Sequence, residues 1–517
     1  MEKVIVIDFG SQYSHLIARR IRELKVFSEL VPFNTFSEKQ ISRDVKAIIL
    51  SGGPSSVYNK DAPRLDKELF DKIISHNVGV LGICYGHQLL ATLLGGRVER
   101  GKYGEYGISY LNVVKEDIIF KDTPRIQRVW MSHRDFVSSI PPHCVKIAET
   151  DYSTIAAFRC GDRIYGIQFH PEVKHTEYGM KILENFLYNI AGCKGTWNIK
   201  NIIENKIRDI KRKYKDGNIL MAISGGVDST TAAFLIKRAV GPDKLHLVFV
   251  NTGLLREKEC EKVLSVLNSL GFKHVHYIDA EEEFLNSLKG VIDPEEKRRI
   301  ISAKFIEVFN RTVQNLEKKY GKFAYLGQGT IYPDRIESGR AGSGSDKIKS
   351  HHNVAIPVAL KFELIEPLSD LYKDEVRKIA LLLGIPLDIV YRHPFPGPGL
   401  AIRIIGEVNR EKLRILRKAD AIVEEEFKRK GLYNKVWQAF PVLLSEKSVG
   451  VRGDSRFYGY IIALRVVVSD DAMTASPAEI PWQFLFRLAN RIINEVPEVS
   501  RVLYDITTKP PATIEFE

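Results

Sequence analysis

The chain has 517 residues, of which 44% are hydrophobic and 27% charged, the usual balance of a globular protein. This length exceeds what one hydrophobic core supports and predicts about three domains, and no apolar run approaches the roughly 18 residues of a membrane span, so we expect no membrane partner. The net charge of +12, from 76 basic and 64 acidic residues, suits polyanionic partners, a class to which nucleotides and pyrophosphate belong as well as nucleic acid.

The first residues and the cysteines bear on the cellular compartment. Met1 and two polar residues lead straight into an apolar run at 4–8, which leaves no room for a signal peptide and predicts a cytoplasmic location. The cysteines show no C-x-x-C spacing, which argues against a zinc site and, in a reducing compartment, against a disulfide framework. They are Cys84, Cys144, Cys160, Cys193 and Cys260.

Residues 1–192 are expected to form the first domain. Short β-rich runs (VIVIDF, AIILSG, VGVLGI, RIYGIQF) alternate there with helical stretches. This alternation is typical of a doubly wound, mostly parallel α/β sheet with helices on its faces.

A candidate nucleophile lies in the string GICYGHQ. Cys84 sits where a β-run gives way to a helical run, and a thiol at a helix N-terminus is stabilised as the thiolate. Gly82 and Gly86 flank it, as a sharp turn that needs backbone freedom requires. A buried cysteine by itself is more often a small hydrophobic residue, so this hypothesis depends on the partners that the chain offers.

Such partners occur in two further strings. His170 and Glu172 in GIQFHPEV are two residues apart, so on a strand they point to the same side, where the carboxylate can orient the imidazole and the imidazole can activate the sulfur. The string SGGPSSV at 51–57 follows a strand at 47–50 and offers N–H groups for an oxyanion. A histidine beside a proline is often only a turn residue, but together these strings indicate acyl transfer.

Residues 193–391 are expected to form a second doubly wound α/β domain after a linker at 192–198. Strands are predicted at 219–224, 245–250 and 274–279, with helical runs between them. We expect a nucleotide site at the carboxyl ends of these strands.

The string SGGVDST predicts that site. It follows an apolar strand and opens a helix, so glycines, hydroxyls and helical N–H groups converge where an anion would bind. The P-loop pattern G-x-x-x-x-G-K-[ST] is absent, which disfavours a P-loop kinase. Asp228 could hold Mg²⁺ against pyrophosphate or could simply cap the helix.

Two Gly- and Pro-rich segments interrupt this second half. The polar segment 338–353 is either a lid over substrate or a disordered insertion, and RHPFPGPGLAIR at 392–403 is predicted to be the hinge into a third domain. Residues 392–517 are expected to form this smaller α+β domain, with a helix at 410–430 and a strand at 458–468.

The combination of strings resembles known families. GICYGHQ followed by HPE resembles the class I glutamine amidotransferases, and SGGVDS resembles the ATP pyrophosphatases, which split ATP between the α- and β-phosphates. Their order, with RHPFPGPGLAIR and the terminal KPPATIEFE, is similar to the glutamine-hydrolysing GMP synthetases over essentially the whole chain.

This resemblance implies a role for each matching residue. Cys84 would attack the glutamine carboxamide, His170 would shuttle the proton and Glu172 would orient His170. Backbone N–H groups of Gly53 and Tyr85 would form the oxyanion hole. ATP would contact Ser224, Gly225, Gly226, Val227, Asp228, Ser229 and Thr230, with Asp228 on Mg²⁺. Xanthosine monophosphate (XMP) would contact Arg298, Gln438, Asp454, Lys509 and Glu515. The resemblance also implies a homodimer formed through the C-terminal domain.

One string departs from the family pattern, and two other functions stay open. The chain reads AIPVALKF at 355–362, with Val358 where the family often has a lid lysine, so the lid contact stays unassigned although Lys361 is close. A related adenylating amidotransferase, for example one that makes NAD or asparagine, would share the ATP loop. A basic nucleic-acid-binding scaffold with a degenerate amidotransferase fold would instead release no ammonia from glutamine. We expect small molecules as partners and no nucleic acid.

Overall fold

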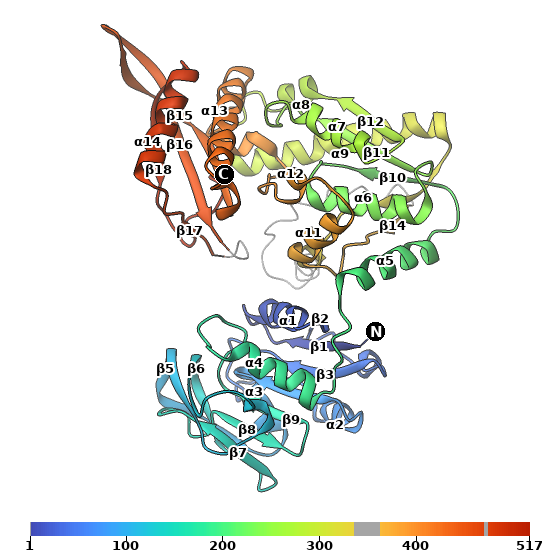
Figure 1. Cartoon of the computed structure of the whole chain (residues 1–517), viewed down its shortest axis with the longest axis vertical. Coiled ribbons are helices and arrows are strands. Elements are labelled where there is room, and N and C mark those ends of the chain that lie inside the picture. The colour runs from blue at the N-terminus through green and yellow to red at the C-terminus, as the bar shows by residue number, and fades with distance from the viewer. Residues whose placement is uncertain (1, 336–361, 470–473) are drawn as a thin grey trace. The chain divides into compact units, whose positions relative to one another are not determined.

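The computed structural model describes residues 2–335, 362–469 and 474–517. The chain divides into two compact units, residues 1–202 and 203–517 (Figure 1). The segment 338–353, Val358 and Lys361 lie outside the described residues, so the lid hypothesis remains a prediction. Among the described helices, none combines the length and the apolar character that crossing a bilayer requires.

A nine-stranded sheet forms the centre of the first unit. Strands β2-β1-β3-β4-β9 pair in parallel, and β8, β7, β5 and β6 extend the sheet with antiparallel pairs. Strands β1, β3 and β4 are apolar and buried almost throughout, as expected for parallel strands covered on both faces. The strands are β1 Lys3–Asp8, β2 Phe27–Pro32, β3 Val45–Leu50, β4 Gly79–Ile83, β5 Arg97–Val113, β6 Ile126–Ser139, β7 Cys144–Glu149, β8 Ala157–Cys160 and β9 Ile164–Ile167. The helices are α1 Ser14–Glu23, α2 Lys67–Ser75, α3 Tyr85–Leu93 and α4 Gly179–Glu184.

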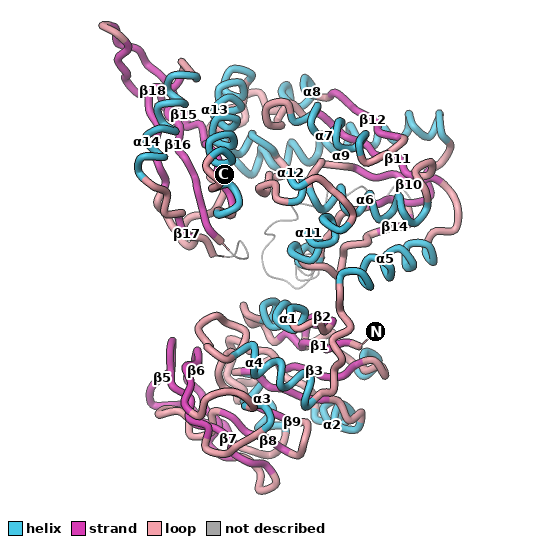
Figure 2. Tube along the Cα trace, in the orientation of Figure 1, coloured by secondary structure: helices cyan, strands magenta, loops and turns pink. Residues whose placement is uncertain are grey.

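The second unit contains a five-stranded, all-parallel sheet in the order β12-β11-β10-β13-β14. Figure 2 shows how its strands alternate with helices, as the sequence predicts. The strands are β10 Asn218–Ala222, β11 Leu245–Asn251, β12 His274–Asp279, β13 Phe323–Gly327 and β14 Glu363–Ile365. The helices are α5 Ile199–Lys213, α6 Val227–Val240, α7 Glu259–Ser269, α8 Glu281–Ser287, α9 Pro294–Tyr320, α11 Lys373–Leu382 and α12 Leu387–Val390.

A third, mostly antiparallel sheet completes the second unit. One hydrophobic core joins this part to the parallel sheet, because Leu220 of β10, Leu416 of α13 and Ile462 of β16 belong to the same buried cluster. The predicted fold class, two α/β domains with a smaller α+β part, is confirmed. The elements here are η4 Gly399–Arg403, α13 Arg410–Arg429, β15 Gln438–Arg452, β16 Ser455–Val468, β17 Ser476–Pro477, α14 Trp482–Glu495 and β18 Val499–Asp505.

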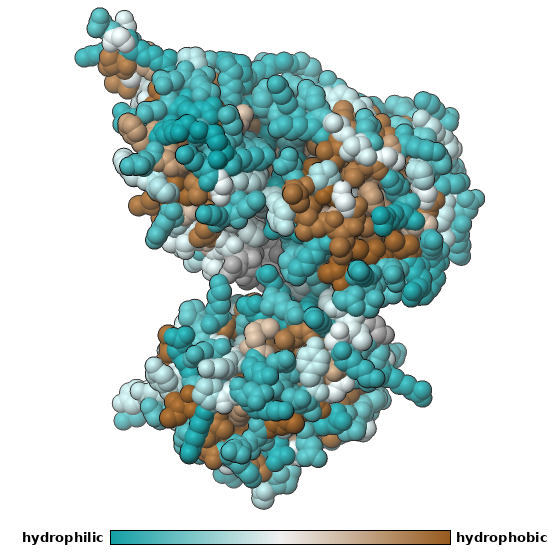
Figure 3. All heavy atoms as spheres, in the orientation of Figure 1, coloured by the Kyte–Doolittle hydropathy of each residue, from teal (hydrophilic) through white to brown (hydrophobic). Residues whose placement is uncertain are grey.

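The surface drawn in Figure 3 is largely hydrophilic, with apolar side chains gathered around α11 and α12. Exposed large apolar residues of these two helices and the turn after them are Leu381, Leu382, Leu387 and Tyr391. Isolated apolar residues are normal on a protein surface, but a group of them is typical of a surface that binds a partner or a ligand.

A disulfide joins Cys144 and Cys160, which corrects the expectation of no such bond. The two cysteines are 16 residues apart in sequence but lie directly opposite each other on the antiparallel strands β7 and β8. Spacing in the sequence could not show this, because strand register alone makes them neighbours.

Removing this disulfide should destabilise the first unit. A bond that closes a loop of this length stabilises a fold by about 3 kcal/mol, so Cys144→Ser with Cys160→Ser should lower the melting temperature of this unit by roughly 6–12 °C. Calorimetry of the double variant and of Cys260→Ser, whose thiol is free, would measure the difference. Equal melting temperatures for the double variant and the unmodified chain would contradict the prediction.

Candidate active sites

Cys84 occupies a strained turn between β4 and α3. Its backbone has φ 55° and ψ −106°, a region that residues other than glycine rarely adopt. Its N–H donates to the carbonyl of Ile167 at 2.9 Å. Such strain in a well-packed turn is typical of a functional residue. The turn therefore presents the sulfur at the start of a helix, as predicted.

The glycines beside Cys84 are needed for close packing rather than for backbone freedom. A Cβ on Gly82 would lie 2.4 Å from the carbonyl oxygen of Gly86, and a Cβ on Gly86 would lie 2.1 Å from that of Leu50. The left-handed conformation that the sequence analysis expected of a glycine falls on Cys84 itself. The predicted turn is present, but for a different physical reason.

His170 and Glu172 form a buried pair beside the sulfur. Nδ1 of His170 donates to Oε1 of Glu172 at 2.7 Å. Burial opposes the positive charge, but the Glu172 carboxylate and the Cys84 sulfur, both hydrogen-bonded to the ring, raise the pKa of His170 well above its usual value. The pairing is as predicted, although both residues follow the end of β9 at Ile167 in a loop and are not on a strand.

The predicted oxyanion hole lines the same cleft. A cleft of about 640 Å³ is lined by Gly53, Cys84, Tyr85 and His170, among others. Tyr85 is the first residue of α3, so its N–H has no acceptor within the helix. Gly53 packs so tightly that a Cβ would lie 2.9 Å from the carbonyl oxygen of Phe9. Gly53 and Tyr85, whose backbone N–H groups are the predicted donors, therefore line the same cleft as the Cys84 sulfur.

Polar side chains that the sequence analysis missed line the rest of this cleft. Arg100, Arg134 and Asp135 border it, and the Asp135 carboxylate accepts from the Tyr58 hydroxyl at 2.9 Å. The arginines can pair with the carboxylate of an amino acid, and Asp135 can pair with its ammonium group. The string SHRD at 132–135 was the available signal, but only the pairing of β5 with β6 brings it to Cys84.

The SGGVDST loop forms the predicted anion cradle at the end of β10. Ser224 Oγ accepts from the N–H of Gly226 at 3.3 Å and lies 3.1 Å from Ser229 Oγ. Gly225 has φ 72°, and a Cβ there would lie 2.4 Å from Val263. Val227 and Thr230 are buried in the first turn of α6. Only glycine fits at position 225 of this loop. The N-terminus of α6 points its free N–H groups at the space beyond the loop.

Asp228 is not the cap of this helix, because the N-cap residue is Gly226. One carboxylate oxygen pairs with Lys373 of α11, and the other, Oδ1, is buried without a hydrogen-bond partner. A buried carboxylate oxygen without a partner is costly and suits a cation. One carboxylate with the phosphates of a bound nucleotide is a usual environment for Mg²⁺, so the residues present fit that ion.

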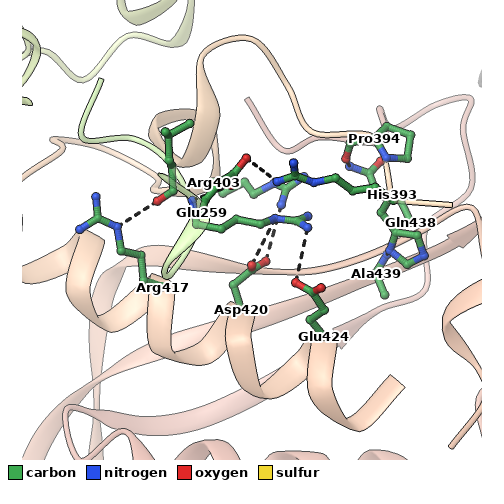
Figure 4. Close-up of polar contacts among 12 residues, drawn as sticks. Glu259, His393, Pro394, Arg403, Arg417, Asp420, Glu424, Gln438 and Ala439 are labelled. Carbon is green, nitrogen blue, oxygen red and sulfur yellow. Dashed lines mark hydrogen bonds and ion pairs between the residues drawn. The ribbon is translucent and has the colours of Figure 1, made fainter. Parts of the chain in front are cut away.

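Two of the residues predicted to bind XMP meet near the C-terminal part of the chain. Gln438 Nε2 donates to Glu515 Oε1 at 2.8 Å and to the carbonyl of Pro394 at 2.9 Å. Arg403 holds both oxygens of Glu515, at 2.9 and 3.0 Å. Figure 4 shows Gln438 beside Pro394 and His393, with Arg403, Asp420 and Glu424 in the adjoining ionic network. Pro394 and Arg403 of the RHPFPGPGLAIR string thus contact Gln438 and Glu515 directly.

Arg298 and Lys509 approach the same region, whereas Asp454 does not. Arg298 donates to the backbone carbonyl of Glu517, and Lys509 bridges to Ala475 next to β17, which pairs with the end of β16 opposite Gln438. Asp454 lies in the turn between β15 and β16, at the far end of a 15-residue strand and roughly 45 Å away by strand rise. Within one chain it is a hairpin turn residue, so the structure does not bring it together with the other four, and its contact with XMP stays a prediction.

Comparisons with known proteins agree with this geometry. The model of the class I glutamine amidotransferase family matches residues 5–190, that of the NAD synthase family matches 199–303, and that of the GMP synthase C-terminal domain matches 425–516. A GMP synthase (glutamine-hydrolyzing) of Pyrobaculum aerophilum is 52% identical over 100% of both chains, and one of Aquifex aeolicus is 51% identical over 99% of both. The chain belongs to the glutamine-hydrolysing GMP synthases.

Among solved structures, a glutamine amidotransferase of Thermotoga maritima is 20% identical and covers 37% of this chain and 99% of its own, with a TM-score of 0.33. Membership of the GMP synthases makes this chain a ligase and confirms the resemblance seen in the sequence. The NAD synthase match accounts for the ATP loop shared with that family, whereas full-length identity and the C-terminal match favour GMP synthases over the NAD-type alternative.

Proposed function

We propose that this chain makes GMP from XMP, with ATP as the activating co-substrate and glutamine as the source of ammonia. Glutamate, AMP and pyrophosphate are the other products. The observation that carries the proposal is the cleft lined by Cys84 and His170, with Glu172 bonded to His170, in a chain whose full-length relatives are GMP synthases.

Glutamine is hydrolysed in the first unit. The Cys84 thiolate attacks the carboxamide carbon, and the N–H groups of Gly53 and Tyr85 stabilise the oxyanion. His170, whose raised pKa keeps a proton on the ring, gives that proton to the departing ammonia and then takes one from the water that hydrolyses the thioester. Glu172 keeps the imidazole aimed at the sulfur.

Purine activation takes place in the second unit. The loop from Ser224 to Thr230 holds ATP, and the O2 oxygen of XMP attacks the α-phosphorus so that pyrophosphate leaves. Ammonia then attacks C2 of the purine, and AMP departs with the oxygen. Asp228 would hold Mg²⁺, which when bound screens the negative charge of the phosphates.

XMP is proposed to contact Arg298, Gln438, Lys509 and Glu515. A phosphate suits the cationic side chains, and the base suits the amide of Gln438 and the carboxylate of Glu515, which lie together. Asp454 is left out of this set because the hairpin keeps it away from the others in one chain.

We further propose domains at 1–192, 193–391 and 392–517, a cytoplasmic location and a homodimer formed through the C-terminal domain. Exposed apolar side chains on α14, on β18 and beyond it support the dimer, and sedimentation of the intact chain would test it. They are Trp482, Phe486, Leu503 and Ile506. The disulfide is compatible with the cytoplasm of a hyperthermophile, in which intracellular disulfides are common.

The choice of acceptor is tested by substrate specificity. The purified chain with ATP, Mg²⁺ and glutamine should form product with XMP and should not react with aspartate or nicotinic acid adenine dinucleotide. Turnover of the dinucleotide, but not of XMP, would assign the chain to the NAD-type alternative.

The XMP contacts are tested with a matched pair of variants. Gln438→Leu removes the amide that bonds Glu515 and should raise KM for XMP about tenfold, the effect of losing one hydrogen bond of about 1.4 kcal/mol, while glutamine hydrolysis continues. Asp454→Asn is the control and should leave KM unchanged. A raised KM in the Asp454 variant would show that this residue acts from a second copy of the chain.

A further inference from the structure

Strand β6 contacts both catalytic residues of the first unit through its backbone. The carbonyl of Trp130 accepts from the N–H of His170 at 3.0 Å, and the carbonyl oxygen of Ser132 lies 3.7 Å from the Cys84 sulfur. Farther along, the carbonyl of Asp135 accepts from Gln88 Nε2 at 2.7 Å. This strand is therefore one wall of the glutaminase cleft.

The support of β6 at this point is unusual. Among the described strands it is the last in the order of the sheet, with β5 as its one neighbour. The register between the two strands shifts between Arg100 and Glu105, so the ladder is interrupted just before the residues that face Cys84. Ser132, His133 and Asp135 have partners on β5, but Arg134, at the register shift, has none, so the ladder is irregular in this segment.

A buried glutamate–histidine pair lies where the ladder resumes. Glu105 and His133 are direct cross-strand partners, and Nε2 of His133 lies 3.1 Å from Oε2 of Glu105. Their side chains are 4% and 5% exposed. Three hydroxyl groups also donate to the carboxylate, from Ser109 at 2.5 Å, Ser153 at 3.0 Å and Thr150 at 3.1 Å.

His133 links Glu105 to the backbone of β6. Nδ1 of His133 lies 2.9 Å from the carbonyl of Asp135, while Nε2 lies beside the Glu105 carboxylate. Burial would raise the pKa of Glu105, but the bonds from His133, Ser109 and Thr150 lower it below its usual value. The imidazole ring therefore bridges a buried carboxylate and the backbone of Asp135.

We propose that Glu105 and His133 are positioning residues for glutamine hydrolysis. The pair fixes the segment 132–135 of β6 against Cys84, so that the Ser132 carbonyl and the Asp135 side chain keep their places in the cleft. Neither residue takes part in the bond changes. This inference rests on the proposed role of Cys84 as the nucleophile.

The test is the neutral variant Glu105→Gln, which keeps the size of the side chain and loses its charge. A displacement of about 1 Å in a catalytic site lowers the rate about 100-fold, so kcat for glutamate release should fall by roughly 10- to 100-fold. GMP formation from added ammonium should be unchanged, because it does not use this cleft. Glu149→Gln, a partly exposed residue of the same sheet, is the matched control and should keep full activity.

Further variants separate positioning from folding. The double variant Glu105→Gln with His133→Gln restores a neutral hydrogen-bonding pair and should lose no more activity than Glu105→Gln alone, because the two side chains act as one unit. Ser109→Ala removes one donor to Glu105 from outside the cleft and should lower kcat severalfold at an unchanged melting temperature. It keeps the proposal testable if the charge variants do not fold.

The outcomes distinguish the two proposals. Wild-type kcat in folded Glu105→Gln or in Ser109→Ala would overturn the positioning role and leave the nucleophile untouched, provided that Cys84→Ala, assayed in parallel, is inactive. Glutaminase activity in Cys84→Ala would overturn the proposed nucleophile, and the positioning role with it. Equal losses of glutamine-dependent and ammonium-dependent synthesis in Glu105→Gln would show a general defect in folding and would also overturn the proposal.

Discussion

Replacing Cys84 by alanine should abolish GMP formation from glutamine and leave GMP formation from ammonium intact. Without the sulfur no thioester can form, and loss of a nucleophile that acts with a histidine typically costs about 10⁴-fold or more in kcat. The ATP loop belongs to the other compact unit, so ammonia supplied in the medium should still be used. The measurement is the rate of GMP formation with glutamine and with ammonium chloride at equal ATP and XMP.

The control for this experiment is Cys260→Ser, a free thiol outside the cleft, which should retain both activities. Loss of both activities in a folded Cys84→Ala protein would contradict the separation of the two sites. Retention of the glutamine-dependent activity would remove Cys84 from the chemistry altogether.

Replacing Asp228 by asparagine should produce the opposite pattern, with ATP-dependent chemistry lost and glutamine hydrolysis partly retained. The buried oxygen without a partner is the observation behind this expectation, because an amide there cannot bind Mg²⁺ as a carboxylate does. Loss of metal-assisted charge stabilisation corresponds to several kcal/mol, so AMP formation should fall about 10²- to 10³-fold. The rate of pyrophosphate release at increasing Mg²⁺ concentrations measures this loss of ATP-dependent activity.

The ion pair with Lys373 offers a second explanation for the importance of Asp228, and one variant separates the two. Lys373→Met removes the pair and leaves the carboxylate, so its Mg²⁺ dependence should stay close to that of the unmodified chain. If Lys373→Met and Asp228→Asn were equally inactive at every Mg²⁺ concentration, the ion pair rather than the metal would explain the loss.

Some features could be predicted from local strings because their chemistry needs residues that are adjacent in the chain. The turn at Cys84, the loop from Ser224 to Thr230 and the closeness of His170 to Glu172 all belong to this class. Alternating apolar runs likewise predicted the parallel strands, since strands buried on both faces need continuous apolar sequence.

Other features were not predicted correctly from the sequence, because they depend on how the chain folds and not on a local pattern. The pairing of His170 with Glu172 was expected from a strand, but a loop produces it. Asp454 was grouped with Gln438 by resemblance, a grouping that hairpin register does not produce within one chain. No disulfide was expected from the cysteine spacing, and strand register brings Cys144 and Cys160 together in one.

The amino-acid sequence alone was therefore enough to indicate the reaction class and to predict the groups proposed to carry it, because a nucleophile at a turn and a phosphate-binding loop are each made by a few consecutive residues. Only the tertiary structure decided which distant residues support them. Sheet register placed Glu105 against His133, the packing of α11 on α6 placed Lys373 on Asp228, and the return of the C-terminal residues to η4 placed Glu515 on Arg403. Such pairs depend on how strands and helices pack across the whole unit, which no short string of residues specifies.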